Sequence, residues 1–215
     1  MGSDGDAISP PWWDEACAQL AARDAVLRGL IECYSGERLQ SRGAPFTTLA
    51  RSVIGQQISV KAAASVWERF ALLFPAGSDP TPAAVLALDG AELRGAGLSA
   101  RKVEYLRSLA QHFSDGRVHI AEWPHMSDAA IAAELTAIRG IGQWTADMFL
   151  IFHLLRPNVL PLGDVGLLRA ISQHYARARP ASRTRLAKLQ RLWRPWCSAA
   201  TWYMWRSLDP LPVAY

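Results

Sequence analysis

The chain has few cysteines and no long apolar run. Its 215 residues include three cysteines, Cys17, Cys33 and Cys197. Their odd number and wide spacing argue against a disulfide framework and against a zinc site. No stretch approaches the roughly 18–20 apolar residues of a membrane-spanning helix. The N-terminal MGSDGDAISP also lacks the basic and apolar segments of a secretion signal. We therefore expect a protein that neither enters a membrane nor is secreted.

Alternation of apolar and polar residues with a period of two is scarce as well, so we expect few strands or none. Apolar residues instead recur at helical spacing, interrupted by glycine and proline breakers and by Asp89-Gly90. The sequence therefore predicts an all-α fold. The predicted helices cover residues 12–35, 45–55, 59–73, 82–88, 99–113, 127–138, 143–155, 165–177, 183–193 and 198–206.

The most specific pattern is LTAIRGIGQWTADMFLIFHLLRPNVLPLGD at residues 135–164. It predicts a helix, a tight turn in which Gly140 and Gly142 flank Ile141, a second helix, and a loop that ends at Asp164. Glycine lets the backbone approach a ligand closely, and the free amides at a helix N-terminus favour an anion such as phosphate. An ordinary glycine turn explains Gly-x-Gly alone equally well, but the extended pattern is more specific.

Acidic residues are nearly missing from residues 156–206, which hold ten Lys and Arg and one acid, Asp164. The formal net charge of the whole chain is only +4, so the basic charge is concentrated there. Such a stretch is typical of a surface that binds a polyanion. A solvated helix face is the ordinary alternative. Beside a turn suited to phosphate, we favour the polyanion.

These segments resemble the helix-hairpin-helix/Gly-Pro-Asp (HhH-GPD) superfamily of base-excision DNA glycosylases. Within it, G-I-G-Q-W-T-A and L-P-L-G-D are most similar to the DNA-3-methyladenine glycosylase II family, and residues 45–59, 97–102 and 193–196 fit as well. The resemblance covers about residues 12–210. It implies two helical subdomains with an active-site cleft between them. One lobe would span about 45–155 and the other 12–44 with 156–215, after a flexible tail at residues 1–11.

The resemblance makes Asp164 the catalytic residue. Breaking the bond between C1′ and a base nitrogen leaves positive charge on the sugar, which a carboxylate stabilises while it orients the attacking water. Asp164 is also well placed as the N-cap of the following helix, and the two roles are compatible. Relatives that also cut the strand carry a lysine where this chain has Trp144. We therefore expect a monofunctional enzyme that forms no Schiff base.

The same resemblance places Trp144, Met148 and Trp205 in the base pocket. Alkylation makes 3-methyladenine and 7-methylguanine cationic, and aromatic faces attract cations. Met148 departs from the tyrosine that relatives can carry, and methionine lacks the ring and the hydroxyl. Trp202, on the same helix face as Trp205, is expected in the core.

The resemblance also assigns DNA contacts to the turn at Gln56 and Gln57 and to the hairpin. Gln57 occupies the position of the side chain that fills the gap left by an extruded base. A plain polar turn, with Ser59 capping the next helix, accounts for the same residues equally well. The predicted DNA-binding residues are Gln56, Gln57, Gly140, Ile141, Gly142 and Thr145.

No cofactor is expected to be required. Three cysteines cannot supply the four ligands of the iron–sulfur cluster that some relatives carry. Related hairpins hold a monovalent cation, Na⁺ or K⁺, through backbone carbonyls, which here would belong to Thr136, Ile138 and Ile141.

The expected partner is damaged double-stranded DNA, with no membrane partner, and the expected state is a monomer. The expected compartment is the bacterial cytoplasm, at the nucleoid, or the nucleus if the source is a eukaryote. Two alternatives stay open: a glycosylase for deaminated or etheno bases, and a non-catalytic lesion-binding DNA module. A helical interaction scaffold explains neither the hairpin nor the basic stretch.

Overall fold

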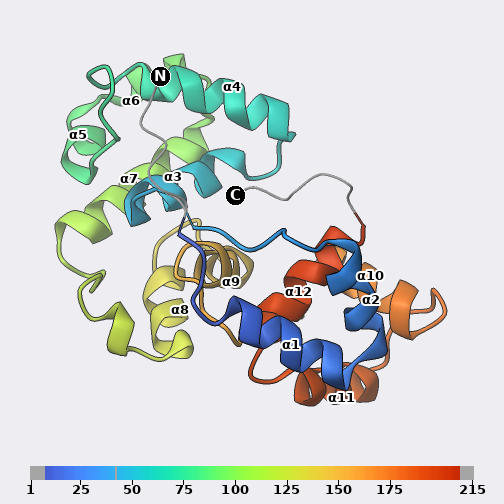
Figure 1. Cartoon of the computed structure of the whole chain (residues 1–215). Helices are drawn as coiled ribbons and strands as arrows, with labels where there is room; N and C mark the ends of the chain where they lie inside the picture. Colours follow the sequence, from blue (N-terminus) through green and yellow to red (C-terminus); the bar gives the residue numbers. More distant parts are fainter. Residues whose placement is uncertain (1–7, 42, 209–215) are drawn as a thin grey trace. The chain divides into compact units, whose positions relative to one another are not determined.

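Helices make up nearly all the regular structure of the protein. The computed structural model describes residues 8–41 and 43–208 (Figure 1). Within these residues the only β pairing is one isolated antiparallel bridge between Ile8 and Ser41. The all-α prediction is therefore confirmed. In the same residues, no helix is long and apolar enough to cross a membrane.

The sequence predicts a flexible N-terminal tail over residues 1–11. Of these, residues 1–7 lie outside the described part of the chain, and residues 8–11 lie within it. Ile8 and Ser41 exchange two backbone hydrogen bonds, of 3.1 and 2.9 Å. The carbonyl of Pro10 accepts a further bond from the amide of Trp13. Residues 8–11 are thus fixed to the rest of the chain.

The described chain divides into two compact units, residues 43–149 and residues 8–41 with 150–208. We call them the first and the second unit. The division falls between Phe149 and Leu150, inside helix α9 (Gln143–Phe152), rather than near residue 155 where the resemblance places a lobe boundary.

Short capped helices build the first unit. The side chains of Ser59, Thr81, Ser99 and Ser127 each accept a backbone N–H at the start of a helix. Such caps satisfy amides that would otherwise have no intrahelical partner. The helices are α3 (Pro45–Gly55), α4 (Val60–Ala71), α5 (Pro82–Ala87), α6 (Gly90–Gly95), α7 (Ala100–Ser114), the 3₁₀ turn η1 (Trp123–His125), α8 (Asp128–Thr136) and the start of α9.

An aromatic core holds the second unit together. Every residue of its last helix is buried, and the Trp202 ring meets Trp13 edge-on at 5.3 Å between centroids. Trp202 is therefore in the core, as predicted. The helices are α1 (Trp13–Arg23), α2 (Ala25–Cys33), the end of α9, α10 (Val165–Tyr175), α11 (Arg183–Trp193) and α12 (Cys197–Arg206).

Two helix predictions were wrong, and the predicted end of a third helix was misplaced. The single helix predicted over 12–35 is two helices, because Asp24 is extended and its carboxylate accepts the amides of Val26 and Leu27 at the start of α2. The Asp89-Gly90 breaker instead begins α6, where the side chains of Asp89 and Glu92 form a reciprocal capping box. The helix predicted to end at residue 155 ends at Phe152.

Candidate DNA-binding hairpin and carboxylate site

The predicted hairpin lies between α8 and α9, in the first unit. Gly140 has φ +93, a backbone conformation that favours glycine. A Cβ at this position would lie 2.2 Å from Cγ of Tyr105, whose ring packs against the turn. Gly142 differs, because a Cβ there would meet nothing within 4 Å. Gly140 is thus required by the fold, whereas Gly142 leaves open space in which a ligand can approach the backbone.

The turn after α3 is fixed to this hairpin. The Gln56 side-chain amide donates to the carbonyl of Gly140 at 2.9 Å. Lys102 donates to the carbonyl of Ile54 at 2.6 Å, and burial lowers the pKa of this lysine. The first unit therefore brings together two of the segments assigned to DNA contact.

The next residue of the turn, Gln57, is exposed and has φ +60. Ser59 accepts the amide of Ala62 at 3.2 Å and caps α4. The capped turn is thus present, and a role for Gln57 in filling a gap between bases stays a prediction.

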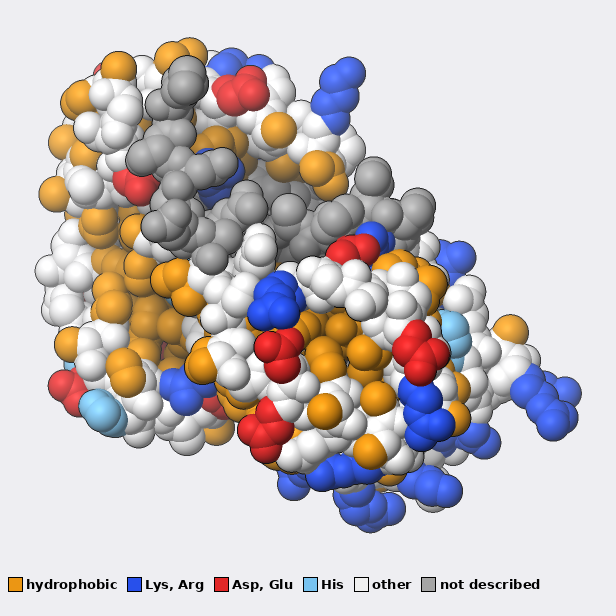
Figure 2. Space-filling model, in the orientation of Figure 1, with side chains coloured by type: hydrophobic (Ala, Val, Ile, Leu, Met, Phe, Trp, Pro, Cys, Tyr) orange, Lys and Arg blue, Asp and Glu red, His pale blue; other side chains and the backbone are white. Residues whose placement is uncertain are grey.

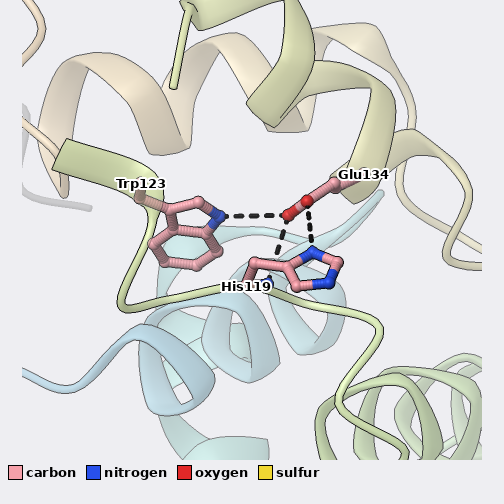
Figure 3. Close-up of polar contacts among 3 residues, drawn as sticks. All are labelled: His119, Trp123 and Glu134. Atoms are coloured by element: carbon pink, nitrogen blue, oxygen red, sulfur yellow. Dashed lines mark hydrogen bonds and ion pairs between the residues drawn. The ribbon is translucent and has the colours of Figure 1, made fainter. Parts of the chain in front are cut away.

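The first helix of the hairpin is anchored by Glu134 (Figure 3). Its carboxylate accepts the Nε1–H of Trp123 at 3.2 Å and contacts Nδ1 of His119 at 2.6 Å. Burial raises the pKa of the Glu134 carboxyl, but the hydrogen bonds from His119 and Trp123 outweigh this effect and hold the pKa below its usual value. Glu134 thereby ties the segment after α7 to the helix that leads into the hairpin.

The second hairpin helix presents Trp144, whose ring is 41% exposed. Met148, one turn later, is only 3% exposed and offers a base almost no surface in this conformation, so its pocket role stays a prediction. The side chain of Thr145 is also buried. Sequence analysis did not single out Asp147, which accepts the Gln143 amide at 2.8 Å and whose pKa is raised by burial.

Asp164 lies at the start of α10, in the second unit. Its Oδ1 accepts the amide of Leu167 at 2.6 Å, which confirms the N-cap prediction, and the Nε1–H of Trp205 at 2.7 Å. A Cβ at Gly166 would come within 3.2 Å of the same oxygen. The Trp205 ring stacks on Phe152, with centroids 5.6 Å apart and an interplanar angle of 17°.

This arrangement fixes one carboxylate at a helix N-terminus beside an aromatic pair. Two N–H donors to one oxygen hold the carboxylate in a single orientation. The bond from Trp205 was not predicted. No local pattern in the sequence signals it, since the two residues are 41 positions apart.

The predicted cation site at the hairpin remains a prediction. The Ile138 carbonyl already accepts the amide of Ile141 at 3.0 Å. The Thr136 hydroxyl donates to the carbonyl of Ala132 at 2.8 Å. Among residues 8–41 and 43–208, no group of three or more His, Cys, Asp or Glu is placed to hold a metal ion. The three cysteines are free thiols.

Comparison with known proteins gives a consistent result. Residues 50–195 match the model of the HhH-GPD superfamily base excision DNA repair protein. The chain is 32% identical over 188 residues to the putative DNA-3-methyladenine glycosylase YfjP of Bacillus subtilis, covering 85% of this chain and 66% of that protein. It is 31% identical to DNA-3-methyladenine glycosylase 1 of Schizosaccharomyces pombe, covering 83% of this chain and 78% of the relative.

Solved structures agree with these sequence matches. A DNA-3-methyladenine glycosidase from Bacillus halodurans superposes with a TM-score of 0.82 at 32% identity, covering 94% of this chain and 92% of that one. The S. pombe 3-methyladenine DNA glycosylase in complex with abasic DNA gives a TM-score of 0.79 at 28% identity, covering 94% of this chain and 100% of that one.

Proposed function

Since the chain belongs to the HhH-GPD superfamily of base excision DNA repair proteins, we propose that it is a monofunctional DNA glycosylase for alkylated bases. It hydrolyses the N-glycosidic bond of bases of the 3-methyladenine and 7-methylguanine type. The observation that carries this proposal is the Asp164 carboxylate, which two N–H donors hold in place. The resemblance of the L-P-L-G-D segment gives this residue the role of the family's catalytic aspartate.

Asp164 acts on the sugar rather than on the base. As the bond from C1′ to the base nitrogen lengthens, positive charge develops on the sugar, and a fixed carboxylate stabilises it. Water then adds its oxygen to C1′ and loses a proton, and the base leaves with the bonding electrons. An alkylated base is already cationic, so it becomes neutral on leaving and needs little acid catalysis.

Trp144 stands where the resemblance places the lysine of strand-cutting relatives. A Schiff base requires an amine at C1′, and the hairpin helix carries Trp144 instead. Lys102, another lysine of the first unit, donates to the Ile54 carbonyl. The product is therefore an intact strand with an abasic site.

Recognition of the base rests on aromatic faces. The exposed ring of Trp144 provides a surface that attracts an electron-poor base. Trp205 has a second role, because its N–H orients Asp164 while its ring stacks on Phe152. The Asp164 carboxylate is therefore hydrogen-bonded to one ring of the stacked pair Trp205 and Phe152.

The hairpin binds the DNA backbone through its amides. Gly142 has open space at its Cα, and the amides of the following helix N-terminus favour phosphate. Damaged duplex DNA is thus the partner, as in the S. pombe relative whose structure contains abasic DNA. The protein acts as a monomer without a required cofactor, in whichever compartment holds the DNA.

The test is release of 3-methyladenine and 7-methylguanine from methylated duplex DNA. The wild type should release both bases, and Asp164→Asn should lose at least about a thousandfold in rate while still binding abasic-site DNA, because asparagine keeps the cap but not the charge. Asp89→Asn, at another aspartate N-cap, is the matched control and should excise normally.

Undiminished release by Asp164→Asn would remove this carboxylate from the mechanism. If the wild type binds duplex DNA yet releases no base, hypoxanthine and etheno adducts should be tested next. Failure with these would leave the lesion-binding alternative.

A further inference from the structure

Two adjoining pockets lie at the end of α10 that is farther from Asp164. The first, of about 680 Å³, and the second, of about 460 Å³, share Tyr175, Ser182 and Arg185 in their walls. Asp164 caps the start of α10, and the pockets open where the helix ends at Tyr175. At about 1.5 Å per residue, the 11-residue helix separates them by roughly 16 Å. These pockets are therefore separate from the carboxylate site.

The pocket walls are strongly basic. They include five cations, and no ion pair among the described residues involves any of them. The one acid in the walls, Asp24, is 5% exposed, and its carboxylate accepts two amides and the polar groups of Tyr175 and Trp193. The five cations are Arg23, Arg177, Arg179, Arg185 and Lys188.

The loop that carries these arginines is ordered by its own hydrogen bonds. Arg177 and Ala178 have positive φ values, of 50° and 61°. The amide of Ala178 donates to the carbonyl of Ser172 at 2.8 Å, and Arg185 donates to the carbonyl of Tyr175. The basic wall is thus held in place before any ligand arrives.

The charge continues along α11. Arg183, Lys188 and Arg191 are all exposed, and residues 177–191 contain no acid. The nine helical residues from 183 to 191, separated by eight rises of about 1.5 Å, span about 12 Å. Blue side chains gather along the edge of Figure 2 where Figure 1 places α11.

We propose that this basic pocket and the adjoining face of α11 bind the phosphodiester backbone of a second DNA segment. That segment belongs to another duplex or to a distant part of the same one. Planar guanidinium groups match phosphate geometry, and neutralising backbone phosphates is how proteins bind DNA without reading its sequence. The inference rests on the proposed function only for its ligand, since it assumes that DNA is the working partner.

The experiment measures whether one protein molecule holds two duplexes. The protein is first bound to an immobilised short duplex with an abasic-site analogue, and capture of a fluorescent undamaged duplex is then followed against salt. The pocket variant combines Arg177→Asn, Arg179→Gln and Lys188→Gln, with asparagine at 177 because it tolerates positive φ.

The control variant removes the same charge from three exposed cations outside the pockets. It combines Arg28→Gln, Arg94→Gln and Arg117→Gln.

The wild type and the control variant should capture the second duplex, and the pocket variant should capture it at least about tenfold less. Each lost phosphate contact lowers the salt slope by about 0.9, so the slope for the second duplex should fall by about 2–3. Base release from a short duplex at saturating enzyme should be the same in all three proteins.

Equal capture by the pocket variant, equal loss in the control variant, or no capture by the wild type would overturn the inference. So would a pocket variant that loses binding to poly-glutamate but not to DNA, which would assign the pocket to an acidic peptide. If the wild type excises no base yet holds two duplexes through the pocket, the proposed catalytic function fails and this inference stands.

Discussion

The hairpin and the Asp164 site rely on different chemical groups, backbone groups in the first and a side-chain carboxylate in the second. In the hairpin the backbone is the working surface, and side chains such as Tyr105 and Gln56 only shape it. At the other site the proposed working group is a side-chain carboxylate, which the helix N-terminus and Trp205 fix. Substitutions in the hairpin should therefore first affect folding and binding, whereas those around Asp164 should first affect the rate of the reaction.

The largest effect on stability is expected at Gly140. Gly140→Ala combines a positive φ with a Cβ 2.2 Å from the Tyr105 ring, so we expect a loss of about 2–5 kcal/mol in the free energy of unfolding. Gly142→Ala, with open space at its Cα, should change it by less than about 1 kcal/mol. Denaturant melts of both variants measure this difference. Equal losses of stability in the two variants would show that the contact with Tyr105 does not make Gly140 harder to substitute than Gly142.

The two units should also differ in their response to acid. Burial lowers the pKa of His153, in the second unit, to about 4 from 6.5. The unfolded chain therefore binds a proton that the folded chain does not, and this stability is present above about pH 6.5 and is lost as the pH falls toward 4. At about 1.4 kcal/mol per pKa unit, the loss is at most about 3.5 kcal/mol.

In the first unit, the lowered pKa of Glu134 gives stability that is present above pH 4.5 and is lost only below it. Melting temperatures between pH 7 and 4 should fall for the wild type, and much less for His153→Gln. Glu134→Gln, the control, should keep the wild-type fall across this window. A His153→Gln curve parallel to the wild type would contradict the assignment.

Trp205→Phe tests the side-chain support of the carboxylate. Phenylalanine keeps an aromatic ring beside Phe152 but cannot donate to Asp164, and a hydrogen bond to a charged group is worth about 1.5–3 kcal/mol. We expect the single-turnover excision rate to fall about tenfold or more, with little change in DNA affinity. Trp202→Phe, on the same helix and in the core, should lower stability instead. A normal rate in Trp205→Phe would mean that the cap alone orients Asp164.

The smallest effect is expected in the turn after α3. Gln56→Ala removes the bond to the Gly140 carbonyl and should cost about 1 kcal/mol in stability. Gln57→Ala, at an exposed neighbouring position, should leave stability unchanged and slow excision several-fold if Gln57 fills the gap between bases. Loss of stability in Gln57→Ala, with normal excision, would assign it to the turn alone.

Sequence patterns predicted most helices because apolar spacing and capping residues are local signals. They failed at Asp24, because apolar residues continue at helical spacing across the boundary between α1 and α2. The boundary is explained by the buried Asp24 carboxylate, which accepts hydrogen bonds from four donors. They failed at Asp89, where the aspartate–glycine signal for a turn outweighed the capping box with Glu92.

At the candidate sites, the sequence predicted roles for Asp164 and the hairpin but not the contacts that support these residues. The Trp205 bond, the Tyr105 ring beside Gly140 and the second pocket, which joins Arg23 to Tyr175, are tertiary contacts between distant positions. Composition alone indicated a basic region, and the fold gathers part of it into the walls of two adjoining pockets.

The exposed Trp144 can serve as an intrinsic fluorescence probe of the protein. Of nine tryptophans, all in the described part of the chain, it is the one with an exposed side chain, and the other eight are shielded partly or fully from solvent. A base stacked on it would change its emission, while core indoles outside the predicted base pocket, such as Trp13 and Trp193, keep a steady background. Encounter with DNA can therefore be followed in real time on the unlabelled wild-type protein, before any bond is broken.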